Sequence, residues 1–242
     1  MSAFAYEIGA VLAAQAQCCP ESPDGAYALP WYLVVGEPGS GRSTAIKAMN
    51  LDWPRGDDPL VLNAPEQLCT YWMPAKAVFI EPGPQLMGAH RNKDRLYELC
   101  DELKQRRTRE PVDGVILVVS LPRLADSDEH ALEQYASSLR SYLIQINQGL
   151  AADVPVYVIA TGIDDLWGFG DVFQWTAERR DEEPWGFGFP PALPSADAVE
   201  HVERALDGVA ARMESMCFAK LSTEDPPERR IRAFQHLAEV RA

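Results

Sequence analysis

Residues 33–46 read Leu33-Val-Val-Gly36-Glu37-Pro38-Gly39-Ser40-Gly41-Arg42-Ser43-Thr44-Ala-Ile46. An apolar run, a glycine-rich loop and a helix-forming segment follow one another here without a break, which is typical of a phosphate-binding P-loop. The glycines let successive backbone N–H groups converge on an anion, and the following helix adds its positive N-terminal end. We therefore predict that residues Gly36 to Thr44 bind phosphate.

One position departs from the P-loop frame GxxxxGK[ST], because Arg42 stands where the frame has lysine. Arginine keeps the positive charge of lysine but not its compact shape. The hydroxyl group of Ser43 is placed to join a Mg²⁺ shell. The alternative interpretation is a glycine-rich turn without a ligand, so the predicted cofactor is GTP or ATP with Mg²⁺, or none.

The composition favours one large α/β domain, or a domain with a small appendage, and disfavours nucleic-acid binding. The chain has 242 residues, of which 47% are hydrophobic, and its net charge is −14. Affinity for nucleic acid depends on clustered Lys and Arg. Only residues 104–109 are locally basic, and we expect this run to be a solvent-exposed helix end. The five cysteines and four histidines lack the spacing of a structural zinc site.

No apolar stretch approaches the roughly 20 residues that span a bilayer. The apolar opening segment, residues 3–19, lacks a basic flank, so we do not expect a signal peptide. Scattered cysteines suit a reducing compartment. These features predict a cytoplasmic location.

Hydrophobic periodicity predicts strands that alternate with helices. The predicted strands are residues 31–35, 77–81, 114–120 and 154–161, with a strand or turn at 69–72 and a short strand at 60–63. The predicted helices are residues 3–19, 43–49, 92–107, 127–148, 196–219 and 229–240. We expect the strands at 114–120 and 154–161 to be buried. We also expect the apolar stripe of helix 196–219, which includes Val199, Leu206 and Met213, to be core.

This order of elements predicts an α/β fold of three layers. The fold would be a P-loop NTPase of the small-GTPase type, with a mostly parallel sheet, helices on both faces and helical additions at both ends. We expect residues 1–190 to form the P-loop domain, including the N-terminal helix. Residues 191–242 would then form a helical extension packed on it.

Several further motifs accompany the loop. They are Leu29-Pro-Trp-Tyr32, Leu51-Asp-Trp53, Val112-Asp-Gly114, Pro155-Val-Tyr-Val-Ile-Ala-Thr161, Trp185-Gly-Phe187 and Arg230-Ile-Arg-Ala-Phe234. In this order the chain resembles the cytoplasmic GTPase-like domain of the IcmF/TssM family, the inner-membrane component of type VI secretion systems and of related type IV apparatus. The Leu-Pro-Trp-Tyr motif joined directly to the loop is more specific to this family than the loop itself.

The resemblance implies a location at the cytoplasmic face of the bacterial inner membrane, between membrane helices that this chain does not contain. It also implies contacts with a TssL/DotU-type membrane partner and with baseplate proteins. An excised domain and a free-standing relative both fit the sequence.

The second motif strand also departs from a working NTPase. Where the family has Asp-Thr-Ala-Gly, this chain has Glu81-Pro82-Gly83-Pro84. Glu81 is the candidate metal ligand beside Ser43, but its extra methylene displaces the carboxylate by about 1.5 Å. Pro84 has no N–H to offer to a γ-phosphate. Gly83 could replace it only if the loop shifted by one residue.

A candidate base-recognition tetrad reads Thr161-Gly162-Ile163-Asp164, with Thr161 and Asp164 as base-binding residues. Gly162 supplies no alkyl stem to cover a guanine ring, so we expect only weak guanine preference. The alternative interpretation of Asp164 is an acid at a helix N-terminus.

Two aromatic-glycine stretches, residues 167–170 and 185–189, offer candidate partner-binding residues: Trp167, Phe169, Trp185 and Phe187. A half-buried edge strand is the alternative. We assign no catalytic residue. Three hypotheses follow: a degenerate, GTPase-like scaffold, an active GTP- or ATP-binding NTPase, and a free-standing regulator that competes for the same partners.

Overall fold

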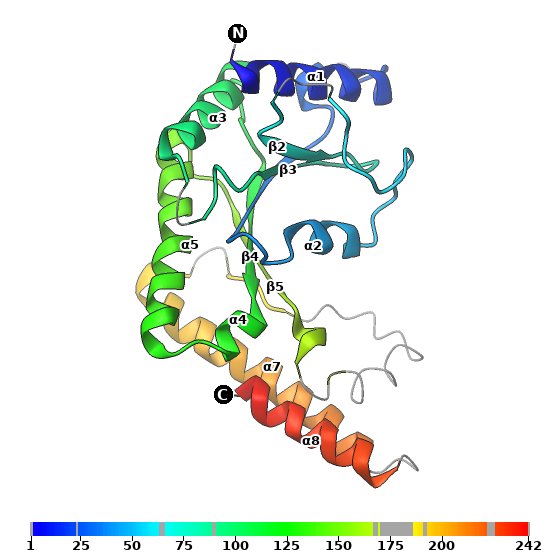
Figure 1. The fold of residues 1–242 in the computed structure, drawn as a ribbon, viewed down its shortest axis with the longest axis vertical. Coiled ribbons are helices and arrows are strands. Elements are labelled where there is room, and N and C mark those ends of the chain that lie inside the picture. The colour runs from blue at the N-terminus through cyan, green and yellow to red at the C-terminus, as the bar shows by residue number, and fades with distance from the viewer. Residues whose placement is uncertain are drawn as a thin grey trace. The chain divides into compact units, whose positions relative to one another are not determined.

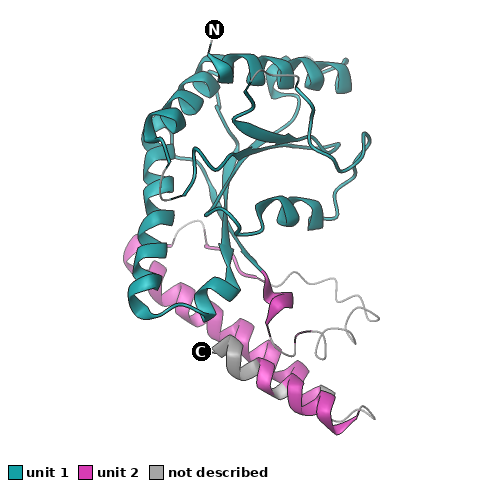
Figure 2. Cartoon of the chain, viewed as in Figure 1, with its two compact units in different colours: residues 1–161 teal, residues 162–242 magenta. Residues whose placement is uncertain are grey.

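The computed structural model describes residues 2–22, 24–62, 66–88, 91–166, 169, 186–190, 193–221 and 226–241. The chain forms two compact units, residues 1–161 and 162–242 (Figure 2). Each unit is described by itself below.

The first unit is built on a five-stranded sheet in the order β2-β3-β1-β4-β5 (Figure 1). The strands are β1 (Trp31–Val35), β2 (Cys69–Trp72), β3 (Val78–Pro82), β4 (Gly114–Ser120) and β5 (Val156–Thr161). All neighbouring pairs are parallel except β2 with β3. The predicted mostly parallel α/β sheet is therefore confirmed.

Helices cover both faces of this sheet. The helices of the first unit are α1 (Ala3–Cys18), α2 (Arg42–Ala48), α3 (Lys93–Arg106), α4 (Leu121–Ala125) and α5 (Glu129–Leu150). Side chains of α1, α3 and α5 share one core with Leu33 and Val35 of β1. Ile46 of α2 packs with Val34 in a second, smaller core. Because Leu33 and Val34 are successive strand residues, the two cores lie on opposite faces.

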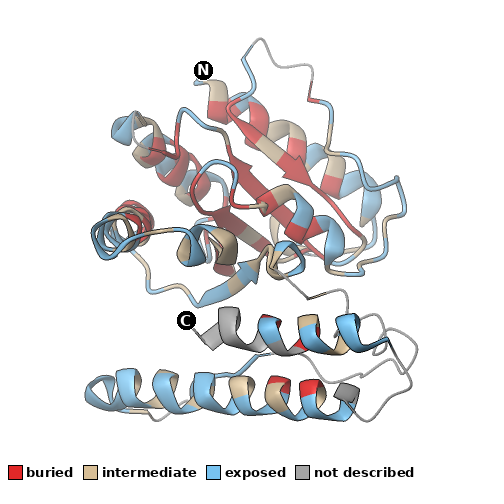
Figure 3. Ribbon diagram, turned by 60° about the horizontal axis from the view of Figure 1, so that its bottom comes forward, coloured by how far each residue is buried: buried red, intermediate tan, exposed pale blue. Residues whose placement is uncertain are grey.

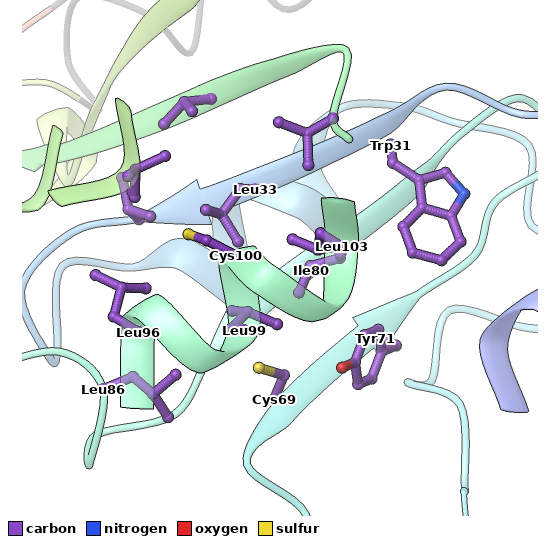
Figure 4. Close-up of a cluster of buried hydrophobic side chains, with 14 of the residues drawn as sticks. Trp31, Leu33, Cys69, Tyr71, Ile80, Leu86, Leu96, Leu99, Cys100 and Leu103 are labelled. Carbon is purple, nitrogen blue, oxygen red and sulfur yellow. The ribbon is translucent and has the colours of Figure 1, made fainter. Parts of the chain in front are cut away.

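The larger core is a continuous apolar layer between α3 and the central strands. Figure 4 shows Leu96, Leu99 and Leu103 of α3 close to Leu33 of β1 and Ile80 of β3. All five of these side chains are fully buried. Figure 3 shows the same burial pattern, with buried residues concentrated in the sheet and on the inner sides of its helices.

The N-terminal helix is an integral part of the first unit, because a buried carboxylate ties it to the sheet. Glu7 of α1 accepts hydrogen bonds from the backbone N–H groups of Leu68 (2.7 Å) and Cys69 (3.3 Å). It also accepts one from the hydroxyl of Tyr71 (2.9 Å). Burial raises the pKa of Glu7, and these three donors partly oppose the shift.

The end of the sheet at which β1 and β4 begin is held by a buried arginine that we expected to be exposed. Arg107 is 1% exposed and pairs with Asp113 at 2.8 Å. The same Asp113 oxygen accepts the backbone N–H of Trp31 at 2.7 Å. The guanidinium of Arg107 also donates to the carbonyls of Ala26 and Leu29, and it stacks on the ring of Trp31. The expectation of an exposed basic run is therefore wrong at Arg107.

Strand β5 is correctly placed but is not buried as expected. Val156, Tyr157 and Val158 are 46%, 51% and 65% exposed. Among the described residues this strand is last in the sheet and pairs only with β4, so none of their strands lies along its outer edge. The expected short strand is also absent over residues 60–62, although Leu60 donates its N–H to the carbonyl of Tyr71.

The second unit contains the short turns η2 (Ile163–Asp165) and η3 (Ser195–Asp197) and the helices α7 (Ala198–Leu221) and α8 (Pro227–Arg241). Met213 and Cys217 of α7 pack with Ala233 of α8. The expected apolar stripe is buried only at this end, since Val199 and Leu206 are 68% and 54% exposed. The described α8 is shorter than α7, which leaves the first part of α7 without this partner.

Candidate functional site

The glycine-rich loop joins the end of β1 to α2, as its sequence predicts. Gly39 and Gly41 have φ angles of 84° and 79°, in the left-handed region that glycine tolerates best. A Cβ atom at Gly36 would lie 2.6 Å from the carbonyl oxygen of Val118 in β4. The glycines therefore allow both the turn and its close approach to the sheet.

Arg42 points toward the end of β3 and is largely buried, at 8% exposed. Its Nη1 donates to the carbonyl oxygen of Pro82 at 2.8 Å, and its Nε lies 3.6 Å from Glu81 Oε1. Burial lowers the pKa of Arg42, and the Glu81 carboxylate is the strongest of the charges that oppose this shift. The residue at the lysine position thus forms an internal ion pair.

The carboxylate of Glu81 is bound by protein donors on both oxygens. The hydroxyl of Ser43 lies 3.0 Å from Oε1 and 2.9 Å from Oε2. The indole N–H of Trp72 donates to Oε2 at 3.1 Å. Ser43 and Glu81, the two residues predicted as metal ligands, are therefore brought together and contact each other directly.

The segment after β3 has no free amide at the predicted γ-phosphate position. The N–H of Gly83 donates to the carbonyl of Leu68 at 2.8 Å, and Pro84 has no N–H. A Cβ atom at Gly83 would lie 2.7 Å from the same carbonyl oxygen. The one-residue shift that would let Gly83 replace Pro84 would break this contact.

Thr161, a predicted base-binding residue, contacts the loop itself. Its hydroxyl lies 2.6 Å from the carbonyl oxygen of Ser40 and 3.2 Å from that of Val119. The hydroxyl therefore links β4, β5 and the loop. Asp164 belongs to η2 in the second unit and is exposed.

A further contact network at the loop was not foreseen from the sequence. The hydroxyl of Tyr142 in α5 donates to Glu37 at 2.9 Å and accepts the N–H of Gly88 at 2.7 Å. The guanidinium of Arg91 lies 4.6 Å from the centre of the Tyr142 ring. Tyr142 lies on the apolar side of a long helix, so its position in the sequence predicts that it is buried but does not predict its polar contacts.

The predicted partner-binding aromatics are only partly visible. Trp167 and Trp185 lie outside the described residues. Phe187 is 43% exposed, and its ring centre lies 6.3 Å from that of Phe189 and 6.2 Å from that of His201. Phe169 packs edge-on against His236 at 5.8 Å. Phe187 is the one of these four residues that the structure describes as exposed.

Comparison with known proteins identifies the family. The family model described as the IcmF-related N-terminal domain matches residues 89–242, well over half of the chain. The chain belongs to the IcmF/TssM family. The matched part of this IcmF-related chain begins after the glycine-rich loop and includes the Arg107–Asp113 pair.

A relative of this IcmF-related chain is the "Type VI secretion system component TssM1" of Pseudomonas aeruginosa. The two are 28% identical over 203 residues, which covers 81% of this chain and 18% of the relative. The chain thus spans less than a fifth of that relative. Among the helices that the structure describes, none has the length and apolarity to cross a membrane.

Proposed function

We propose that this domain is a degenerate, GTPase-like P-loop fold that acts as a protein-binding scaffold in a type VI secretion system. The residues that would hold Mg²⁺ and nucleotide in an active relative of this fold are engaged with one another instead. The domain would hydrolyse no nucleotide at a useful rate, and it would serve the secretion system through its surfaces.

The closed cluster around Glu81 carries this proposal. A near-octahedral Mg²⁺ would take Ser43 and a carboxylate oxygen as ligands, and it would first have to displace the hydrogen bond between Ser43 and Glu81. A divalent cation beside Glu81 would also face the buried positive charge of Arg42, whose Nε is 3.6 Å from Oε1. The residues therefore fit a metal–nucleotide complex poorly.

Family membership, and a relative named as a type VI secretion system component, support a place for this scaffold in such a system. We propose that it works at the cytoplasmic face of the bacterial inner membrane, where a TssL/DotU-type protein and baseplate proteins would be its partners. Phe187, together with Trp167 and Trp185, is proposed to contribute to these contacts.

Isothermal titration calorimetry with GTP, ATP and their diphosphates, each with Mg²⁺, tests the proposal. We expect no binding at micromolar nucleotide concentrations and no phosphate release. Micromolar binding with Mg²⁺-dependent turnover, abolished by Ser43→Ala, would overturn it. Thr108→Ala is a suitable control, because Thr108 is exposed and lies outside the glycine-rich loop.

A second candidate function, an active NTPase, is favoured by one observation. The glycine-rich loop has glycines in the left-handed region and approaches β4 closely, which supports a loop that could bind phosphate. In that case Arg42 would have to leave Pro82 and Glu81 when nucleotide binds. The same titration separates the two functions.

A further inference from the structure

A groove of about 450 Å³ runs along the outer side of the first unit, between α3 and α5. Lys93 and Tyr97 line it from α3, and Arg140, Ser141 and Ile144 line it from α5. It lies apart from the Glu81 cluster, and none of its lining residues was singled out from the sequence.

The groove is basic although the chain as a whole is strongly acidic, with a net charge of −14. None of the residues that line it is an aspartate or a glutamate. Lys93 and Arg140 are both exposed, and within the described part of the chain neither forms an ion pair. Two unpaired cations in one groove form a local site for negative charge.

The floor of the groove is ordered by hydrogen bonds that leave one donor available. Ser141 Oγ accepts from Arg91 Nη2 at 2.8 Å and from Gln145 Nε2 at 3.1 Å. A serine hydroxyl that accepts twice still has its own hydrogen to donate. Within the described residues no hydrogen bond uses that hydrogen, so it is available to an incoming acceptor beside Lys93 and Arg140.

An apolar groove lies on the other side of Ile144. It has a volume of about 170 Å³ and is lined by Leu143 and Ile144 of α5 and by Val154 and Val156 at β5. Ile144 is 44% exposed and lines both grooves, so it forms the crest between a basic surface and an apolar one. A small inorganic anion would use only the basic half of this surface.

We propose that this two-sided surface of α5 binds an acidic, amphipathic segment of a partner protein. Carboxylates of the segment contact Lys93, Arg140 and the hydroxyl of Ser141. Its apolar side chains cover Ile144 and enter the groove at β5. The inference rests on the proposed scaffold function, and it names the chemistry of one partner surface.

The test uses the full chain and a fluorescent peptide of about 15 residues, long enough to form a helix. The peptide carries glutamates along one side of a leucine stripe, and a matched peptide has glutamine in their place. Fluorescence anisotropy should show saturable binding of the acidic peptide, with a Kd on the order of 10 μM. The glutamine peptide should bind at least about tenfold more weakly.

Charge-reversal variants locate the site. Arg140→Glu and Lys93→Glu should each weaken peptide binding by about tenfold, and Ile144→Asp should do the same by removing the apolar crest. The matched control is Lys76→Glu, which changes the net charge equally at an exposed position outside the groove and should change the Kd by less than about twofold. Circular dichroism on each variant verifies that it is folded.

Several results would overturn the inference: no saturable binding of the acidic peptide, equal binding of both peptides, or equal weakening by Lys76→Glu. Competition by inorganic pyrophosphate as strong as that by the peptide would show a simple anion site instead. Self-association through this surface, seen by sedimentation and abolished by Ile144→Asp, would show a second copy as the occupant. The nucleotide titration above tests the scaffold proposal separately, so the two can fail independently.

Discussion

The substitution Glu81→Gln should destabilise the folded protein in the absence of any nucleotide. It removes the charge that faces Arg42 while keeping the size of the side chain and one acceptor oxygen. Breaking one side of a buried ion pair costs about 3–5 kcal/mol, because the remaining charge is buried without a counter-ion. Arg42 keeps its bond to the Pro82 carbonyl, and the pair is not in tight contact at 3.6 Å. We therefore expect a loss of about 2 kcal/mol.

Urea unfolding at pH 7.5, followed by tryptophan fluorescence, measures this loss. Arg42→Met and the double variant complete a double-mutant cycle. The losses of unfolding free energy in the two single variants, added together, should exceed the loss in the double variant by about 1 kcal/mol or more. A carboxylate whose role is to bind a metal commonly lowers the stability of the metal-free protein instead. If Glu81→Gln leaves the free energy of unfolding unchanged or increases it, the reasoning that the site is closed by structural contacts is refuted.

Three further predictions concern the fold. Asp113→Ala should lower the free energy of unfolding by about 3 kcal/mol in urea titrations, because it leaves Arg107 buried without its counter-ion. The control is Asp101→Ala, which removes an exposed pair with Lys104 and should lower that free energy by less than about 1 kcal/mol. Burial raises the pKa of Glu7 above its ordinary value of 4.5, so the folded state binds the proton of this carboxyl group more tightly than the unfolded state does. The free energy of unfolding of the wild type, relative to that of Glu7→Gln, should therefore decrease as pH rises from about 4.5 toward 7. A constant difference between the two proteins in urea titrations over this pH range would contradict the prediction. Gly41→Ala should cost about 1–2 kcal/mol because its φ is 79°, whereas Gly9→Ala, inside α1 and with no atom within 4 Å of the added Cβ, should not destabilise; equal effects in thermal melts would argue against the left-handed loop.

The sequence predicted the sheet well because its inner strands carry strong and simple signals. Continuous apolar runs identified β1 and β4 at their observed bounds, and turn residues marked most helix ends. The burial of β5 was mispredicted, since an apolar run does not reveal whether a strand has one neighbour or two. The predicted burial of the apolar stripe of α7 was wrong for a related reason. Val199 and Leu206 have helical spacing, but this spacing does not show how far a partner helix extends.

The chemistry of the site was harder to predict because it depends on side-chain direction. The residue types at positions 42, 43 and 81 indicated an altered metal site, and the predicted order of strands and helices placed Arg42, Ser43 and Glu81 at the same end of the sheet. That Arg42 would bond the Pro82 carbonyl, or that Trp72 would donate to Glu81, follows from rotamers and burial that no local pattern contains. Arg107 shows the same limit, since a charged residue at a helix end is usually solvated, and here three other segments supply its partners.

The contacts at the two ends of the sheet are made by separate sets of residues, so the fold would persist if the glycine-rich loop changed. Two of the motifs that carry the family resemblance, around Trp31 and Asp113, meet where β1 and β4 begin, through one carboxylate oxygen and Arg107. That cluster, together with the Glu7 contacts to β2, fixes α1, β1, β2 and β4 without any atom of the glycine-rich loop. Loss of a bound nucleotide at the opposite end would therefore remove none of these bonds. Under the proposed scaffold function, the internal pair between Arg42 and Glu81 would supply the contact between the loop and β3 that a bound metal would otherwise provide.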